Sequence, residues 1–505
     1  MQETSIPPAV RAEDVLAWTR SVDVVVVGLG IAGACAALEA KRAGAEVLVL
    51  ERASGGGGAS AVSSGIFYLG GGTAVQAACG FEDSAGEMAR FLEATTESAD
   101  PAKVRAYCED NAAHFDWLEA QGVPFERSYF KGKAVFLDTT ECLFYTGNEK
   151  VWPYCTLATP APRGHKVAGT GESAGAVAMN ALLGTCVDEG IAVLYDTRVT
   201  APILDASGRA VGVRARQTTG NIDVRARRGV IIAAGSFNMN EPMVRANIPL
   251  LTDTAVPLGV PSNDGAGVLL GQSAGAAAEA MDGVIATASI YPPAQLIKGI
   301  IVNCRGERFV AEDAYHGRTA AFVMKQPEQT AYLIVDSDVF AHPEIVSANH
   351  TLVDGWDTVA EMEQGLAMPV GALQRTLERY NRDAAAGLDS AFHKQPEWLK
   401  PLAAPPYAAF DISFNRSSYL FITLGGLRTG LNGEALDAGG RPIPGLYAVG
   451  ASAAHLPRSG EAYASGLSLG PGSYFGRRAG RHAAGPGVAL QRAGRTGRTM
   501  AVSKL

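Results

Sequence analysis

The feature that most constrains the fold of this chain is a glycine-rich turn that follows a short apolar run near the N-terminus. Residues 22–27 read VDVVVV, a largely β-branched run that predicts a strand buried on both faces. The turn GLGIAG follows at residues 28–33, residues 34–44 (ACAALEAKRAG) predict a helix, and EVLVL at 46–50 predicts a second strand. This order of elements is that of a complete βαβ unit.

The turn has the GxGxxG spacing of dinucleotide-binding units, supplied by Gly28, Gly30 and Gly33, and an acid, Glu51, ends the second strand. Gly28 allows the tight turn, and Gly30 lets backbone amides approach a pyrophosphate at the positive end of the helix. Glu51 can accept hydrogen bonds from both hydroxyls of a ribose. A purely structural glycine turn is the less favoured alternative, because the strand and helix lie where the motif needs them.

The segment after Glu51 distinguishes between two dinucleotides. An NAD-binding chain normally continues with another βα unit, whereas residues 52–72 read RASGGGGASAVSSGIFYLGGG. A loop of small residues such as Gly58, Ser60, Ser64 and Gly65 can run beneath a pyrophosphate and an isoalloxazine ring. The sequence therefore favours FAD over NAD.

Changes of pattern along the chain predict an α/β protein of two domains. Residues 191–228 alternate as short strands, and a buried parallel strand resumes at GLYAVG, residues 445–450. Residues 280–420 have more prolines and aromatics and few glycine clusters. We therefore expect a discontinuous, Rossmann-like FAD-binding domain with a parallel sheet, formed by 1–279 and 421–505, and an inserted α+β capping (catalytic) domain at 280–420.

Charge and hydropathy exclude some partners. The 43 lysines and arginines are outnumbered by 51 acidic residues, the net charge is −8, and no long basic run occurs, which argues against nucleic acid as the main partner. The first twenty residues have no apolar core of a secretory signal, and no uncharged stretch approaches the roughly 20 residues of a membrane-spanning helix. We expect no transmembrane segment, although peripheral contact with a membrane is compatible with the sequence.

The cysteines and the last three residues bear on location. The seven cysteines form no CxxC pair and no metal-ligand spacing, which predicts reduced thiols in the cytoplasm and no metal site. Residues 503–505 read SKL, the form of a peroxisomal address in eukaryotes. Coincidence is the preferred explanation, because the Ala-, Gly- and Arg-rich composition is typical of bacteria.

Several further motifs carry a resemblance over residues 22–481. They are GGASAVSSG (57–65), SNDGAG (262–267), VNCRGERFVAED (302–313), TLERYNRDAAAGLDSAF (376–392) and LGGLRT (424–429) leading into GLYAVG. With these motifs the chain resembles the FAD-dependent 3-ketosteroid dehydrogenases, the Δ4-(5α) type above all, of the fumarate reductase/succinate dehydrogenase flavoprotein superfamily. The resemblance implies a cytoplasmic flavoprotein of steroid metabolism and lipid degradation, with FAD held non-covalently.

The resemblance also implies which residues contact FAD. The expected set consists of Gly28, Gly30, Ala32, Gly33, Glu51, Gly58, Ala59, Ser60, Ser64, Gly65, Val199, Gly235, Asp264, Gly450, Ser468 and Leu469. One departure is Ala451, which stands where the family commonly has an acid that helps to hold the ribityl or ribose part.

The positions that bind a dicarboxylate in fumarate reductases look uncharged in this chain. Residues 315–316 (YH) stand near the place of the proton-donating arginine, with Arg318 as the alternative if the alignment has a short gap. Residues 421–422 (FI) replace two histidines, and Tyr463 replaces a carboxylate-binding arginine. Because unpaired carboxylates in a closed site cost several kcal/mol, a neutral apolar substrate, a steroid, fits better.

The 3-ketosteroid dehydrogenases suggest a role for each catalytic candidate. Tyr463, with a backbone amide from Gly466–Ser468, donates to the 3-keto oxygen; Ser465 takes the α-proton and Tyr315 relays it. The expected substrate-binding residues are Tyr463, Gly466, Leu467 and Phe421. Each tyrosine could instead be a half-buried packing residue, and Ser465 could merely be a small residue beside the flavin. His316 and His455 are expected to be loop or surface residues.

Four functions stay open, of which one is preferred. The preferred function is α,β-desaturation at C4–C5 of a 5α-3-ketosteroid, with the hydride passing to flavin N5. The others are 1,2-desaturation of a 3-ketosteroid, reduction of a small unsaturated acid, and a flavin-dependent sensor or carrier without turnover. The sequence leaves the electron acceptor open.

Overall fold

A computed structural model describes residues 5–96, 100–135, 137–171, 173–287, 293–340 and 351–485. Its largest element is a nine-stranded sheet, in which the five strands β21, β10, β2, β3 and β7 run parallel to one another, with β7 at one edge. Their bounds are Arg20–Val27 (β2), Val47–Leu50 (β3), Ala192–Leu194 (β7), Gly220–Ile232 (β10) and Pro442–Ala448 (β21). The predicted βαβ unit and the predicted parallel sheet are confirmed.

Strand β10 belongs to two parts of this sheet. Residues 220–225 pair antiparallel with β9, residues from Val224 onward pair in parallel with β2, and residues from Val230 onward pair in parallel with β21. The remaining strands are Val10–Arg11 (β1), Arg198–Leu204 (β8), Ala210–Gln217 (β9) and Glu434–Leu436 (β20). The run of strands expected at 191–228 is therefore present, and the chain returns to the same sheet at β21, close to the C-terminus.

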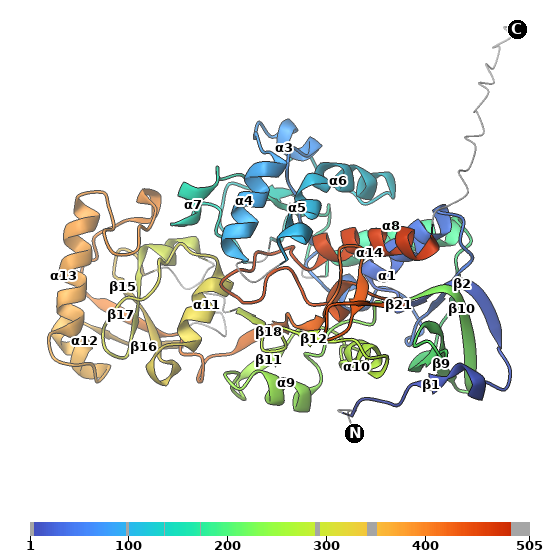
Figure 1. The fold of residues 1–505 in the computed structure, drawn as a ribbon. Coiled ribbons are helices and arrows are strands. Elements are labelled where there is room, and N and C mark those ends of the chain that lie inside the picture. Colours follow the sequence, from blue (N-terminus) through green and yellow to red (C-terminus); the bar gives the residue numbers. More distant parts are fainter. Residues whose placement is uncertain are drawn as a thin grey trace, which may run out of the picture.

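Helices α1 (Ile31–Arg42) and α14 (Leu469–Ala484) pack against each other beside this sheet, with α8 (Gly175–Asp188) next to α1 (Figure 1). Their backbones touch because α14 has glycine at the contacts. A Cβ on Gly476 would lie 2.4 Å from the carbonyl oxygen of Ala32, and one on Gly480 would lie 2.2 Å from that of Ala36. Helix α14 therefore packs directly on the helix of the glycine turn.

Residues 58–166 add short helices and a small sheet, and the helices of residues 74–120 lie above α1 and α14 in Figure 1. The helices are Gly58–Ala61 (α2), Ala74–Ala78 (α3), Ala85–Thr95 (α4), Pro101–Glu109 (α5), Asn111–Ala120 (α6) and Tyr154–Leu157 (α7). The sheet consists of Ile66–Tyr68 (β4), Leu143–Phe144 (β5) and Gly164–Lys166 (β6). A fully buried ion pair between Arg163 and Asp83, 2.8 Å apart, ties these elements together.

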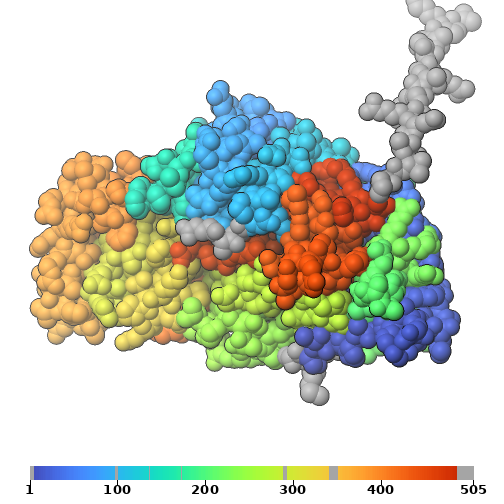
Figure 2. Space-filling view, viewed as in Figure 1, coloured from blue at the N-terminus to red at the C-terminus, as the bar shows by residue number. Residues whose placement is uncertain are grey.

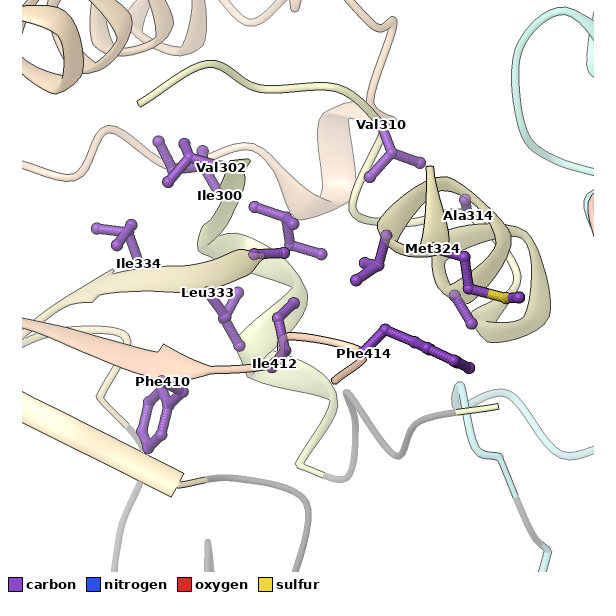
Figure 3. Close-up of a cluster of buried hydrophobic side chains, with 14 of the residues drawn as sticks. Ile300, Val302, Val310, Ala314, Met324, Leu333, Ile334, Phe410, Ile412 and Phe414 are labelled. Carbon is purple, nitrogen blue, oxygen red and sulfur yellow. The ribbon is translucent and has the colours of Figure 1, made fainter. Parts of the chain in front are cut away.

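A four-stranded antiparallel sheet lies at the opposite end of the molecule from the N-terminal strands (Figures 1 and 2). Its strands are Ile300–Asn303 (β14), Ala331–Asp336 (β15), Thr351–Trp356 (β16) and Tyr407–Asp411 (β17), with helices His316–Met324 (α11), Val359–Gly365 (α12) and Ala372–Ala385 (α13). Buried side chains such as Ile300, Leu333 and Ile412 form its core (Figure 3).

Small elements join the two parts of the molecule. They are Glu241–Asn247 (α9), Ala255–Pro257 (β11), Ala266–Ser273 (α10), Ala278–Glu279 (β12), Val284–Thr287 (β13), Tyr419–Thr423 (β18) and Gly426–Leu427 (β19). The buried cluster of the antiparallel sheet extends back to Phe237 and Leu269. The domain boundaries at 280 and 420 stay a prediction, since the packing runs continuously across the first of them.

None of the described helices is both long enough and apolar enough to cross a membrane. All seven cysteines are free thiols. Residues 503–505, which read SKL, lie outside the described part of the chain.

Candidate active site

One cavity runs between the sheet, the small-residue loop and the segment before α14. We call the part lined by Gly28, Gly30 and Glu51 the glycine-turn side. The part lined by Tyr315, Tyr463, Ser465 and Ser468 is the hydroxyl side. The two sides come from segments that are hundreds of residues apart in sequence and share a single space.

Two glycines of the turn have contacts that a side chain would prevent. Gly28 has a φ of +100°, and a Cβ there would lie 2.5 Å from the carbonyl oxygen of Ala233. A Cβ on Gly33 would lie 2.1 Å from the carbonyl oxygen of Gly28, so glycine lets α1 approach the turn. Gly30 is the N-cap of α1 and faces the cavity, where a side chain would occupy ligand space.

The small-residue loop closes on the start of α1. The backbone N–H of Ile31 donates to Ser60 Oγ at 3.2 Å, and Ser60 also lines the cavity. This bond takes up one of the amides at the positive end of the helix, and the neighbouring backbone of Gly30 stays on the cavity surface. The loop and the helix start therefore form one wall suited to a pyrophosphate.

Glu51 lies at the end of β3 with its carboxylate on the cavity surface. One carboxylate oxygen accepts from the N–H of Leu29 at 2.7 Å, and the other accepts from the N–H of Ala53 at 2.9 Å. These bonds orient the carboxylate while each oxygen retains a further lone pair for a ribose hydroxyl. The geometry fits the ribose role that the sequence predicts.

Asp264 lies behind the cavity wall. Its carboxylate pairs with Arg52 at 2.7 Å and with Arg198 at 3.7 Å, and both arginines line the cavity. Asp264 is thus placed to act on a ligand through the two arginines rather than by direct contact. Neither arginine was singled out from the sequence, although Arg52 directly follows Glu51.

Most residues expected to contact FAD line the cavity. They are Gly28, Gly30, Ala32, Glu51, Gly58, Ala59, Ser60, Ser64, Val199, Gly235, Gly450, Ser468 and Leu469. Gly33, Gly65 and Asp264 stand behind its surface; a Cβ on Gly65 would lie 2.7 Å from the side chain of Val167. Ala451, the departure from the family pattern, also lines the cavity.

The hydroxyl side contains two hydrogen-bonded pairs. The hydroxyls of Tyr315 and Ser465 are 3.0 Å apart, and those of Tyr463 and Ser468 are 2.8 Å apart. The rings of Tyr315 and Tyr463 have centroids 6.4 Å apart, so the pairs are neighbours. Burial raises the pKa of Tyr463 to about 12, although hydrogen bonds from Ser468 oppose that rise. Tyr463 is therefore a protonated donor at neutral pH.

Two of the expected substrate-binding residues lie elsewhere. Gly466 lines the cavity, but Leu467 is fully buried and faces a second, smaller cavity. Phe421 packs into the core of the antiparallel sheet, and its strand neighbours Leu420 and Ile422 line the cavity instead. Side chains alternate along a strand, so a position matched to a family histidine does not by itself determine which face it presents.

His316 is buried and lines the cavity, which corrects the expectation of a loop or surface residue. Burial, with the nearby charge of Lys133, lowers the pKa of His316 to about 3, so the ring is neutral at pH 7. Its centroid lies 4.0 Å from that of Tyr315, and its Nδ1 bonds the hydroxyl of Thr287. The polar residues around His316 in the sequence gave no signal of this burial.

His455 lies in a loop, one of the two expected places, but it is buried in the cavity wall and not at the surface. Burial lowers its pKa to about 4. Its Nδ1 lies 3.2 Å from the carbonyl oxygen of Leu424, and because a carbonyl only accepts, Nδ1 carries the proton.

Among the described residues that line the cavity, the only cationic side chains are Arg52 and Arg198, both paired with Asp264. Arg318, the alternative proton donor, donates to the hydroxyl of Tyr154 at 2.6 Å and does not reach the cavity surface. The hydroxyl side combines neutral polar groups with apolar ones such as Ile285 and Ile422. Within the described ranges, no three His, Cys, Asp or Glu side chains gather as a metal site.

Comparison with known proteins decides the cofactor. Residues 23–462 match the family model described as FAD binding domain. The chain belongs to this family. It is an FAD-dependent oxidoreductase of the fumarate reductase/succinate dehydrogenase flavoprotein superfamily, which confirms the prediction of FAD.

Three similar proteins illustrate the range of the family. A 3-oxo-5-alpha-steroid 4-dehydrogenase of Comamonas testosteroni is 29% identical, over 87% of this chain and 94% of that protein. A vinyl phenol reductase of Lactiplantibacillus plantarum is 28% identical, over 93% of this chain and 97% of that protein. The crystal structure of 3-ketosteroid-Δ4-(5α)-dehydrogenase from Rhodococcus jostii in complex with 4-androstene-3,17-dione is 40% identical and covers 95% of this chain and all (100%) of that one, with a TM-score of 0.89.

Proposed function

We propose that this flavoprotein removes hydrogen from C4 and C5 of a 5α-3-ketosteroid to give the Δ4-3-ketosteroid. The observation that carries the proposal is the pair of hydroxyl contacts, Tyr315 with Ser465 and Tyr463 with Ser468, in the same cavity as the glycine turn. The relative from Rhodococcus jostii, described as a Δ4-(5α)-dehydrogenase, supports the same regiochemistry.

Tyr463 is the group that binds the 3-keto oxygen. When the hydroxyl of Ser468 donates to Tyr463, the phenol proton is left to donate to the ketone. A donor held in place before the reaction stabilises the negative charge that grows on the carbonyl oxygen as the α-proton leaves. Gly466, at the turn before α14, can add a backbone amide to the same oxygen.

Ser465 and Tyr315 form the path for the proton lost from C4. A serine hydroxyl becomes an effective base only if its own proton moves on. Tyr315, 3.0 Å away, takes up that proton as its own phenol proton passes on to water outside the site. Bound FAD supplies the complementary chemistry by accepting the hydride from C5. The chain's own residues thus have to hold the ketone, receive the proton and exclude water.

The charges of the site oppose the fumarate-type alternative. A dicarboxylate on the hydroxyl side would meet neutral His316, neutral His455 and tyrosines in place of cations. An unpaired carboxylate in such surroundings is costly. Fumarate, succinate and urocanate are therefore expected neither to bind nor to react.

Anaerobic mixing of the oxidised holoprotein with steroids, followed by flavin absorbance, tests the proposal. 5α-Androstane-3,17-dione should bleach the flavin, and 4-androstene-3,17-dione should not. Bleaching by both would indicate 1,2-desaturation, and reoxidation of the reduced flavin by fumarate at a comparable rate would indicate an acid reductase. Lack of bleaching by any ketosteroid would support the sensor or carrier alternative.

A further inference from the structure

A buried asparagine that the proposed mechanism does not use lies directly behind the proton path. Asn148 belongs to the loop between β5 and α7, and only 1% of its surface is exposed. Buried polar side chains usually have a structural partner, so the question is what Asn148 binds. Its partners are the backbones of the two segments that carry Tyr315 and Ser465.

The loop of Asn148 holds the main chains of both proton-path residues. Asn148 Oδ1 accepts from the backbone N–H of Tyr315 at 2.9 Å. Two residues earlier, the carbonyl oxygen of Thr146 accepts from the backbone N–H of Ser465 at 3.0 Å. Residues 146–148 therefore connect the start of α11 to the segment before α14, beneath the hydroxyl contact between Tyr315 and Ser465.

Packing keeps this loop close to the segment of Ser465. A Cβ on Gly147 would lie 2.7 Å from the Cβ of Ala464, so glycine permits the approach. Asn148 Nδ2 makes a longer contact of 3.5 Å to the carbonyl oxygen of Glu461. The side chain of Glu149, also 1% exposed, accepts from the N–H of Gly147 at 2.9 Å and from the hydroxyl of Tyr68 at 2.9 Å.

We propose that Asn148 is a positioning residue that sets the distance between Tyr315 and Ser465, an inference that rests on the proposed function. The two hydroxyls lie on segments 150 residues apart, so their contact depends on what holds the two backbones. Loss of the Asn148 carbonyl removes the acceptor of the Tyr315 N–H and lets that backbone shift. Displacement of a reacting group by about 1 Å can cost on the order of a hundredfold in rate.

The test compares variants in the anaerobic flavin-reduction rate with saturating 5α-androstane-3,17-dione. Asn148→Leu removes the acceptor, and Asn148→Ser leaves one only on a shorter side chain, so both should slow reduction by roughly tenfold or more. Asn148→Asp keeps an acceptor and should recover most of the rate. Because Tyr463 holds the ketone, the Kd of the steroid should change much less than the rate. Equal losses in the Leu and Asp variants would overturn the proposal.

Asn381 supplies the matched control. Its side chain also accepts from one backbone N–H (Leu402, 2.7 Å) and donates to one backbone carbonyl (Leu402, 2.8 Å), but in the antiparallel-sheet region. Asn381→Leu should leave the rate of flavin reduction near that of the wild type. If Asn381→Leu slows flavin reduction as much as Asn148→Leu does, the effect of Asn148→Leu is general destabilisation and the positioning role is wrong.

A double variant separates this proposal from the proposed function. If Asn148 acts through Tyr315, Asn148→Leu should cause no further loss in a Tyr315→Phe background, because residues that act as a unit are non-additive. Multiplicative losses would overturn the positioning role alone. If Tyr315→Phe reduces the flavin as fast as the wild type, or if no ketosteroid bleaches the flavin, the proposed proton path is wrong. The positioning role, which depends on that path, is then wrong as well.

Discussion

The two sides of the cavity are built in different ways. The glycine-turn side uses backbone and one carboxylate, and its parts from Gly28 to Ser60 lie within a short stretch of the chain. The hydroxyl side uses side chains from separate segments around residues 315 and 463–468, supported by a third at 146–148. Cofactor binding is thus encoded locally, whereas the proposed chemistry depends on how distant segments are held together.

The difference also concerns charge. Arg52 and Arg198, which follow Glu51 and precede Val199, bring cationic charge to the cavity wall, and both pair with Asp264 behind it. On the hydroxyl side the titratable groups His316 and Tyr463 are held neutral at pH 7 by burial. One cavity can therefore hold an anionic cofactor and a neutral apolar substrate.

The largest effect is expected from a change that breaks the glycine-turn side alone. Gly33→Val should abolish FAD binding, because its Cβ would lie 2.1 Å from the carbonyl oxygen of Gly28 and push α1 off the turn. The ratio of flavin to protein absorbance in the purified protein measures the loss. Gly184→Val is the control, since a Cβ on that exposed glycine of α8 would meet no atom within 4 Å. Retention of full FAD by Gly33→Val would contradict the packing argument.

The next largest effect is expected from substitutions that change the hydroxyl side and leave the glycine-turn side intact. Ser465→Ala and Tyr315→Phe should each slow flavin reduction by roughly a hundredfold or more, the range for loss of a general base. The double variant should be hardly slower than either single one if the 3.0 Å contact is a single proton path. FAD content should stay that of the wild type. A near wild-type rate in Ser465→Ala would make that serine a packing residue.

Tyr463→Phe is expected to cost about a hundredfold in flavin reduction, the usual effect of one lost donor to a developing oxyanion. The steroid Kd should weaken less, since the donation is strongest in the transition state. Stopped-flow reduction with a saturating 5α-3-ketosteroid measures the rate. Ser468→Ala, which removes the partner 2.8 Å from the phenol, should fall between Tyr463→Phe and the wild type. If Tyr463→Phe reduces the flavin faster than Ser468→Ala does, a group other than Tyr463 donates to the 3-keto oxygen of the steroid.

The two sides also differ in how far the sequence could predict them. Gly28, Gly30 and Glu51 follow from local spacing, because a strand, a turn and a helix in succession determine where their atoms lie. Tyr315 and Ser465 were matched through family motifs, and their hydroxyl contact depends on tertiary packing. Phe421 was expected in the cavity but lies in the core, since strand alternation there turns Leu420 and Ile422 inward.

The placement of two buried residues, His316 and Asn148, could not be predicted from the sequence. A histidine in a polar stretch such as EDAYHGR predicts an exposed residue, and only packing against Tyr315 and Thr287 buries His316. Asn148 lies outside every motif that carried the resemblance, and its role depends on two backbones brought together by the fold. Both residues support others in the site, which is why patterns of residue types do not reveal them.

The smallest expected effect is on the pH dependence of stability, and it tests whether the hydroxyl side is neutral. The pKa of His316 is about 3 in the folded protein, against roughly 6.5 in an unfolded chain. Between these values the unfolded state binds a proton that the folded state does not, so stability must fall as the pH falls from about 6.5 toward 3. His455, with a pKa of about 4, adds to the same slope. The slope of the unfolding free energy against pH is proportional to the difference in bound protons between the two states. In the His316→Leu variant this difference should be smaller by about one proton.

Chemical unfolding of the holoprotein at a series of pH values between 7.5 and 4.5 measures this slope. Above pH 7 both histidines are neutral in the folded and the unfolded state, so the curves of wild type and His316→Leu should run parallel there and diverge only below. That parallel region serves as the internal control for any change in packing. An unchanged slope in His316→Leu would mean that His316 takes up its proton while folded, which would place a cation beside Tyr315 and reopen the site to anionic substrates.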